Sequence, residues 1–135
     1  MNLDNEFNEM SKFGIKFSKP KRKKSLKRRL KEKADKLFSL QVRRMGVCEL
    51  KDKDNIRCGG VLQCAHIETR GAHAIRWNMN NALCICAGHH VYYTNHPSLW
   101  DEVVAFFFSD KWKYVEEHRR DIWDKDIEKV LKQLG

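Results

Sequence analysis

The chain lacks any long hydrophobic run, and its first residues lack the apolar segment of a secretory signal. The longest apolar stretch, Val103–Phe108, is much shorter than the roughly twenty residues that span a bilayer. Met1–Met10 is acidic and polar. These two absences lead us to expect a soluble, cytoplasmic protein with no membrane partner.

The chain has no internal repeat, and its number of cysteines is odd. Five cysteines cannot all pair, and in a reducing compartment Cys and His at short spacings favour metal binding over disulfides. A chain of 135 residues can form one domain with a modest core. A structural metal would reinforce such a core.

Positive charge is concentrated in one segment. The formal net charge is +9, but Lys19–Arg44 holds thirteen Lys or Arg residues against Glu32 and Asp35, a net of +11. The remaining residues therefore carry −2. A basic segment beside a nearly neutral domain favours a polyanionic partner, most simply nucleic acid, although a solvated charged surface is the ordinary alternative.

The N-terminal third divides into an arm and a helix. Residues 1–24 show no sustained period and are expected to form a flexible basic arm. Residues 25–46 predict a basic amphipathic helix, with Ser25 as its N-cap and Gly46 at its end. Its apolar stripe comprises Leu26, Leu30, Ala34, Leu37, Phe38 and Met45.

The remainder predicts an α+β core followed by helices. In residues 47–97, strand-like runs at 61–67 and 82–85 flank a polar, irregular stretch, and a helix is expected at 87–95. Residues 98–135 predict a C-terminal helical extension, capped by Ser98 at its start, that serves packing alone.

Cys86 and His89 have the two-residue gap of a zinc-ligand pair. Structural zinc needs four such ligands, usually as two close pairs, and Cys48 with Cys58 is the candidate second pair. Nine residues separate those two cysteines, so a hairpin-like insertion at Lys51–Asn55 would have to bring them together.

Another pairing remains open. Cys48 and Cys58 could be unrelated thiols, with Cys84 and Cys86 forming a different pair. Cys64 and Cys84 lie in strand-like runs, where a buried free cysteine is the expected identity.

A second histidine, His90, follows the zinc candidate His89 directly. Neighbouring helical residues point about 100° apart, so His90 could face a second metal. His66 lies twenty-four residues before His90 and fifteen before Asn81.

The order His66, Asn81, His90, framed by the Cys/His pairs, resembles the HNH, or ββα-metal, endonuclease superfamily. The likeness covers roughly residues 35–100 and is to phage-type HNH endonucleases, including relatives of the NinG/Rap recombination nucleases. It implies a small zinc-stabilised ββα-metal core flanked by the basic helix and the C-terminal helices. The segments that carry it are Leu37–Ser39, Arg43–Cys48, Leu62–Ile67, Ile75–Trp77, Asn80–Leu83, Cys86, His89–His90 and Thr94–Pro97.

The resemblance implies hydrolysis of DNA phosphodiester bonds with 5′-phosphate and 3′-hydroxyl products. His66 would be the general base, Asn81 would hold the loop or His66 in the active orientation, and His90 would bind a catalytic Mg²⁺ or Mn²⁺. The implied reactions are nicking of duplex DNA or cutting of branched recombination intermediates, in a host cytoplasm if the chain is phage-encoded. Cutting both strands would need two events or a homodimer.

One position departs from the family pattern. Many members carry an Asp or His metal ligand immediately before the base, whereas this chain has Ala65. His96 is the first candidate for the missing ligand, with Glu68 and His73 behind it. A helix-terminal surface histidine is the alternative for His96.

DNA contacts are expected from the basic segment and from two loop arginines, although single loop arginines are equally often simple surface charges. The expected contacts are Lys21, Arg22, Lys23, Lys24, Lys27, Arg28, Arg29, Arg70 and Arg76. Two other functions remain open. One is a zinc-containing nucleic-acid-binding module without catalysis, and the other is a zinc adaptor that binds a protein through its C-terminal helices.

Overall fold

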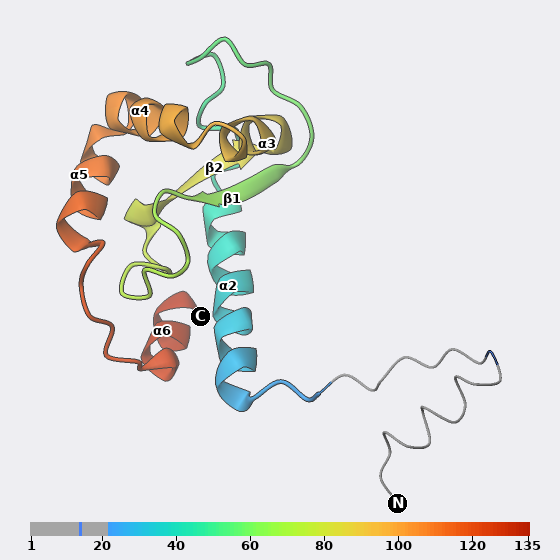
Figure 1. Ribbon diagram of the computed structural model, residues 1–135, viewed down its shortest axis with the longest axis vertical. Helices are drawn as coiled ribbons and strands as arrows, with labels where there is room; N and C mark the ends of the chain where they lie inside the picture. Colours follow the sequence, from blue (N-terminus) through green and yellow to red (C-terminus); the bar gives the residue numbers. More distant parts are fainter. Residues whose placement is uncertain (1–13, 15–21) are drawn as a thin grey trace, which may run out of the picture.

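The computed structural model describes Gly14 and residues 22–135, which form an α+β fold (Figure 1). Over these residues, five α-helices surround one two-stranded antiparallel sheet, which confirms the predicted fold class at that level. Most of the arm expected at residues 1–24, including Lys21, lies outside the described residues. Within the described part, no helix combines the length and apolar character needed to cross a bilayer.

Helix α2 (Leu26–Arg43) carries the basic segment. Ser25 caps it as predicted, because its Oγ accepts a hydrogen bond from Arg28 N at 3.2 Å. The helix ends before Gly46, whose φ of +78° continues the turn. Its buried residues are Ala34, Phe38 and Val42. The predicted stripe is therefore wrong at both ends, where Leu26 and Met45 are exposed.

The sheet pairs β1 (Leu62–His66) with β2 (Ala82–Cys86), from Leu62 opposite Cys86 to His66 opposite Ala82. Every residue of β2 is buried. Between the strands, the chain turns irregularly and enters a short 3₁₀ helix, η1 (Met79–Asn81). Helix α3 (Ala87–Thr94) starts directly after β2, so strand, loop, strand and helix follow in the predicted order.

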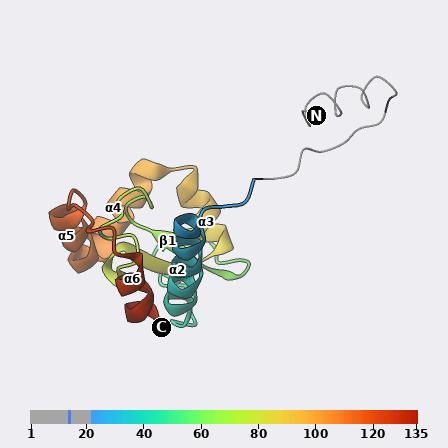
Figure 2. The same cartoon turned by 90° about the horizontal axis from the view of Figure 1, so that it is seen from below.

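The two faces of the sheet pack against different elements, as Figures 1 and 2 show. Ala82 and Cys84 pack against Phe38 and Val42 of α2. The alternate residues Leu83 and Ile85 join the larger core; its helical members are Tyr93, Trp100, Val104 and Val115. The period-two alternation of a strand thus buries both faces of β2.

The C-terminal segment forms three helices, α4 (Pro97–Phe107), α5 (Ser109–His118) and α6 (Ile127–Leu134). Pro97, rather than Ser98, begins α4, and this correction follows from the fixed φ of proline, which suits a first helical position. Helix α6 returns to lie beside α2 (Figure 2), where Gln41 Nε2 donates to Leu134 O at 2.7 Å.

Candidate functional site

Cys48, Cys58, Cys86 and His89 lie together although three separate segments supply them. Their ligand atoms all lie within 4.8 Å of one another. His89 Nδ1 is 3.6 Å from Cys48 Sγ, 3.7 Å from Cys58 Sγ and 3.1 Å from Cys86 Sγ. Four ligands about 2.0–2.3 Å from one tetrahedral zinc ion would be about 3.6 Å apart, so the group could hold a metal ion and is consistent with structural zinc.

The alternative pairing of Cys84 with Cys86 is not found. Cys84 is fully buried against α2 and is not part of the cluster. Cys64, the other cysteine outside the cluster, is partly buried, and burial raises the pKa of its thiol to about 11. Burial also raises the pKa of the Cys84 thiol, so both thiols are protonated near neutral pH.

The insertion between Cys48 and Cys58 is tied to α3 by Asp54. One carboxylate oxygen of Asp54 lies 2.8 Å from His89 Nε2, and the other accepts a hydrogen bond from Tyr93 Oη at 2.5 Å. A carboxylate on the far nitrogen of a metal-binding histidine sets the tautomer of the ring and aims Nδ1 at the metal. Sequence reasoning missed Asp54 because nothing in its spacing singled it out from the polar loop.

Gly59 and Gly60 bring Cys58 against the start of α3. Gly60 has a φ of +79°, and a Cβ on it would lie 2.8 Å from Ala87 Cβ. Gly59 N and His89 N both donate to Cys86 Sγ, at 3.4 and 3.5 Å. Burial opposes ionisation of Cys86, but these hydrogen bonds lower its pKa to about 6.

The surroundings of Cys58 oppose its ionisation. Desolvation and the adjacent Cys48 and Cys86 raise the pKa of Cys58 to about 12. A divalent ion reverses that preference, because it converts coordinating thiols to thiolates. The donor set and its electrostatics therefore suit a thiophilic metal such as zinc.

A cavity of about 770 Å³ lies between α2 and β1. It is lined by Asp35, Lys36, Ser39, Leu40, Arg43, Cys64, His66, Arg70 and His90. A second cavity, of about 300 Å³, adjoins the same two histidines on the side of α3 and α4, where Asp101 also lines it. His66 and His90 thus line both cavities.

His66 is the last residue of β1, and its ring is oriented from two sides. Nε2 donates to the main-chain oxygen of Arg76 at 2.9 Å, and Phe38 packs 5.5 Å away between ring centroids. A carbonyl can only accept, so Nε2 carries the proton and neutral His66 keeps a lone pair on Nδ1. Burial lowers the pKa of His66 and so favours the neutral ring, more than the Arg76 carbonyl raises it.

Asn81 is fully buried and closes the loop that precedes it. Its Oδ1 accepts from Glu68 N at 2.7 Å, and its Nδ2 donates to Ile75 O at 3.2 Å and to Glu68 O at 3.3 Å. Although Asn81 also ends the 3₁₀ helix η1, its side chain links residues 68 and 75 across the loop.

His89 and His90 point in different directions, as their helical spacing predicted. While His89 faces the cysteines, His90 Nδ1 donates to Gln63 Oε1 of β1 at 2.7 Å. That bond leaves Nε2 of His90 with its lone pair. Gln63 was not foreseen, since its contact depends on how α3 lies across the sheet.

The structure does not bring the candidates for the missing metal ligand to the cavities. His96 stacks on Tyr92 and its Nδ1 bonds to Tyr92 O at 2.8 Å. His73 stacks on Trp123, and the Glu68 carboxylate accepts from Thr69 N. None of these three candidates lines either cavity.

The predicted DNA contacts also divide into two groups. Arg70 is exposed and lines the larger cavity, whereas the Arg76 side chain is 14% exposed and is bound by Asp35. Residues Arg22, Lys23, Lys24, Lys27, Arg28 and Arg29 are exposed before and within the first turn of α2. Lys36 and Arg43, which line the cavity, were missed because the whole helix is rich in lysine and arginine.

No protein-family model, curated protein or solved structure matches the chain.

We predict that the purified chain binds one equivalent of zinc and that Cys86→Ser abolishes this binding. Loss of a structural ion removes several kcal/mol, so the melting temperature should fall by about 10 °C or more. Metal analysis and thermal melting would measure both effects. Cys64→Ser is the matched control, and equal zinc loss in both variants would contradict the assignment.

Proposed function

We propose that the protein is a metal-dependent HNH endonuclease that hydrolyses DNA phosphodiester bonds to 5′-phosphate and 3′-hydroxyl ends. The observation that carries the proposal is the convergence of His66 and His90 on shared cavities, each with one ring nitrogen left without a proton. The resemblance of the sequence to HNH endonucleases supports the same function.

In this proposal, His66 acts as the general base. Its Nδ1 accepts the proton of a water that attacks phosphorus in line with the leaving 3′ oxygen. The Arg76 carbonyl retains the proton on Nε2 and thereby keeps the basic nitrogen directed away from the loop. Asn81 supports His66 indirectly, because it holds the loop from which that carbonyl projects.

His90 would hold the catalytic ion through Nε2, with Gln63 fixing the ring. A bound Mg²⁺ or Mn²⁺ would polarise the scissile phosphate and stabilise the leaving oxygen. With Ala65 unable to bind a metal, a second protein ligand would come from a carboxylate that lines one of the two cavities. Asp101 fits best, because it lines the smaller cavity with His90, whereas Asp35 in the larger cavity is held by Arg76 and Trp77.

Cations line the larger cavity beside the two histidines. Lys36 and Arg43 of α2 lie on its wall, and Arg70 reaches it from the loop. Phosphate contacts of this kind position a nucleic acid without reading its bases. The cavity therefore suits the sugar–phosphate backbone on either side of the bond to be cut.

A zinc-containing nucleic-acid-binding module without catalysis is the alternative function, and Ala65 is the observation that favours it. Both functions use the same cationic wall. They differ in whether divalent ions produce cleavage, so assays on duplex, nicked, single-stranded and branched DNA would separate them.

We predict that His66→Ala lowers the rate of Mg²⁺- or Mn²⁺-dependent cleavage by at least about 100-fold, because a general base contributes that much. His118→Ala is the control, since His118 lies on α5 and bonds to Asp121 at 2.7 Å. Equal cleavage by wild type and His66→Ala would remove His66 from the mechanism.

The pH dependence should follow the neutral form of His66. Burial lowers the pKa of His66 below its ordinary value of 6.5, so cleavage should rise with pH through a midpoint below 6.5 and then level off. A rate–pH profile of the wild type would measure that midpoint. A midpoint above 6.5 would conflict with the buried, neutral base.

We predict that Asp101→Asn raises the Mg²⁺ concentration needed for half-maximal cleavage by about tenfold, because a lost carboxylate ligand weakens metal binding. Glu102→Gln is the matched control, since Glu102 is the next residue of the same helix and does not line the cavity. An unchanged metal requirement in Asp101→Asn would exclude this ligand.

We predict that Lys36→Gln with Arg43→Gln weakens DNA binding and reduces the slope of log K against log salt by about 2, since each lost phosphate contact removes about one unit. Lys113→Gln, an exposed change on α5, should leave the slope unaltered. Fluorescence anisotropy across a salt series would measure the slopes. Equal slopes in wild type and the double variant would show that DNA does not contact these two residues.

A further inference from the structure

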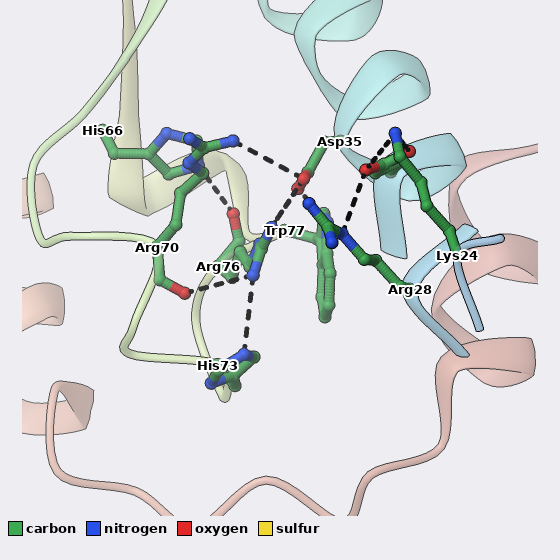
Figure 3. Close-up of polar contacts among 9 residues, drawn as sticks. Lys24, Arg28, Asp35, His66, Arg70, His73, Arg76 and Trp77 are labelled. Carbon is green, nitrogen blue, oxygen red and sulfur yellow. Dashed lines mark hydrogen bonds and ion pairs between the residues drawn. The ribbon is translucent and has the colours of Figure 1, made fainter. Parts of the chain in front are cut away.

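Asp35 is a partly buried carboxylate of α2 that binds two consecutive residues of the loop between the strands. Figure 3 shows it between α2 and the loop that carries Arg70, Arg76 and Trp77. Only 19% of its side chain is exposed, and Arg76, its main partner, is 14% exposed. The contact is therefore an internal tie between segments forty-one residues apart.

The two oxygens of Asp35 are occupied by directed donors. Arg76 Nε donates to Oδ1 at 3.0 Å and Arg76 Nη2 donates to Oδ2 at 2.6 Å, which is the two-pronged pairing of guanidinium with carboxylate. Trp77 Nε1 also donates to Oδ1, at 2.9 Å. Three hydrogen bonds from adjacent residues determine both the position and the orientation of this part of the loop.

The main-chain oxygen of Arg76 is the group that accepts the hydrogen bond from His66 Nε2. Asp35 binds the side chain of the residue whose carbonyl orients the proposed base. On the other side of that carbonyl, Asn81 Nδ2 holds Ile75 O. The peptide that faces His66 is thus held by Asn81 through residue 75 and by Asp35 through residues 76 and 77.

We propose that Asp35 is a positioning residue that aligns His66 through Arg76. The inference rests on the proposed nuclease function, in which His66 is the base, and adds to it a residue that lies on α2, outside the strand–loop–strand–helix unit. Asp35 itself does not touch the substrate or a metal in this role. Its contribution is to hold the acceptor that selects the tautomer and angle of the imidazole ring.

The contact between Asp35 and Arg76 requires a carboxylate on a side chain as short as that of aspartate. An amide at position 35 would present an N–H group toward the guanidinium of Arg76, where only acceptors fit. Lysine at position 76 would keep the charge and the main-chain carbonyl but could not form the two parallel hydrogen bonds. Asp35→Asn and Arg76→Lys therefore break the same contact from its two ends.

The kinetic test compares Asp35→Asn with wild type in the full-length chain. We expect kcat to fall by about 10- to 100-fold, because a base displaced by a fraction of an ångström loses that much. KM should not rise, since the variant removes a negative charge from a cavity that would receive phosphate and releases Arg70, now 3.7 Å from Asp35.

Glu32→Gln is the matched control, because it makes the same change of charge one turn earlier on α2. Glu32 pairs with Lys24 and Arg28, and its carboxylate makes no hydrogen bond or ion pair with the described loop residues. A fall in kcat equal to that of Asp35→Asn would show that the charge of the helix, and not the tie, is responsible, and would overturn the proposal.

A double-mutant cycle tests whether Asp35 acts through Arg76. Arg76→Lys should lower kcat as much as Asp35→Asn does, and the double variant should be no slower than either, because both break one contact. Multiplied effects in the double variant would mean that the two residues act independently, which also overturns the proposal.

A readout that needs no cleavage separates this inference from the proposed function. Nitrogen-15 NMR of labelled histidine should show His66 with its proton on Nε2 in wild type and a mixture of both tautomers in Asp35→Asn. The indole N–H of Trp77 should exchange with solvent faster in the same variant. An unchanged His66 tautomer would overturn the positioning role, whereas failure of the wild type to cut DNA would count against the nuclease proposal.

Discussion

The arrangement of the site depends on the cluster of Cys48, Cys58, Cys86 and His89 at the junction of β2 and α3. A two-stranded sheet is marginal by itself, and here it separates two small groups of buried side chains. The cluster joins the turn after α2, the end of the polar insertion and the first turn of α3. Because His90 follows His89 directly, whatever orients His89 also determines where His90 points.

The loop between the strands has little regular structure, yet it provides the hydrogen-bond acceptor for His66. Some of its main-chain groups pair with one another in turns, and side chains bind others. Asn81 bonds to the main chain at residues 68 and 75, and Asp35 binds the side chains of Arg76 and Trp77. Buried and partly buried side chains that pair the polar groups of such a loop can hold it in one conformation.

Basic residues of α2 lie in two settings along its length. Those of the first turn are exposed, and in the proposed function they would attract a polyanion without reading its sequence. Lys36 and Arg43, further along, line the larger cavity beside the two histidines. Between them, the acidic Asp35 faces the loop instead of solvent, so one helix supplies cations to the cavity and a carboxylate to the wall behind it.

The sequence alone determined the features that depend on local spacing. The Cys86/His89 gap, the divergence of His89 and His90, the cap at Ser25 and the two strands follow from helical and strand periods, which act over a few residues. Tertiary structure decided the contacts of Asp35, Asp54 and Gln63, which join residues twenty-seven or more positions apart. It also places His96 outside both cavities and buries most of the Arg76 side chain. Long-range partners depend on how helices lie across the sheet, and spacing in one sequence carries no record of that packing.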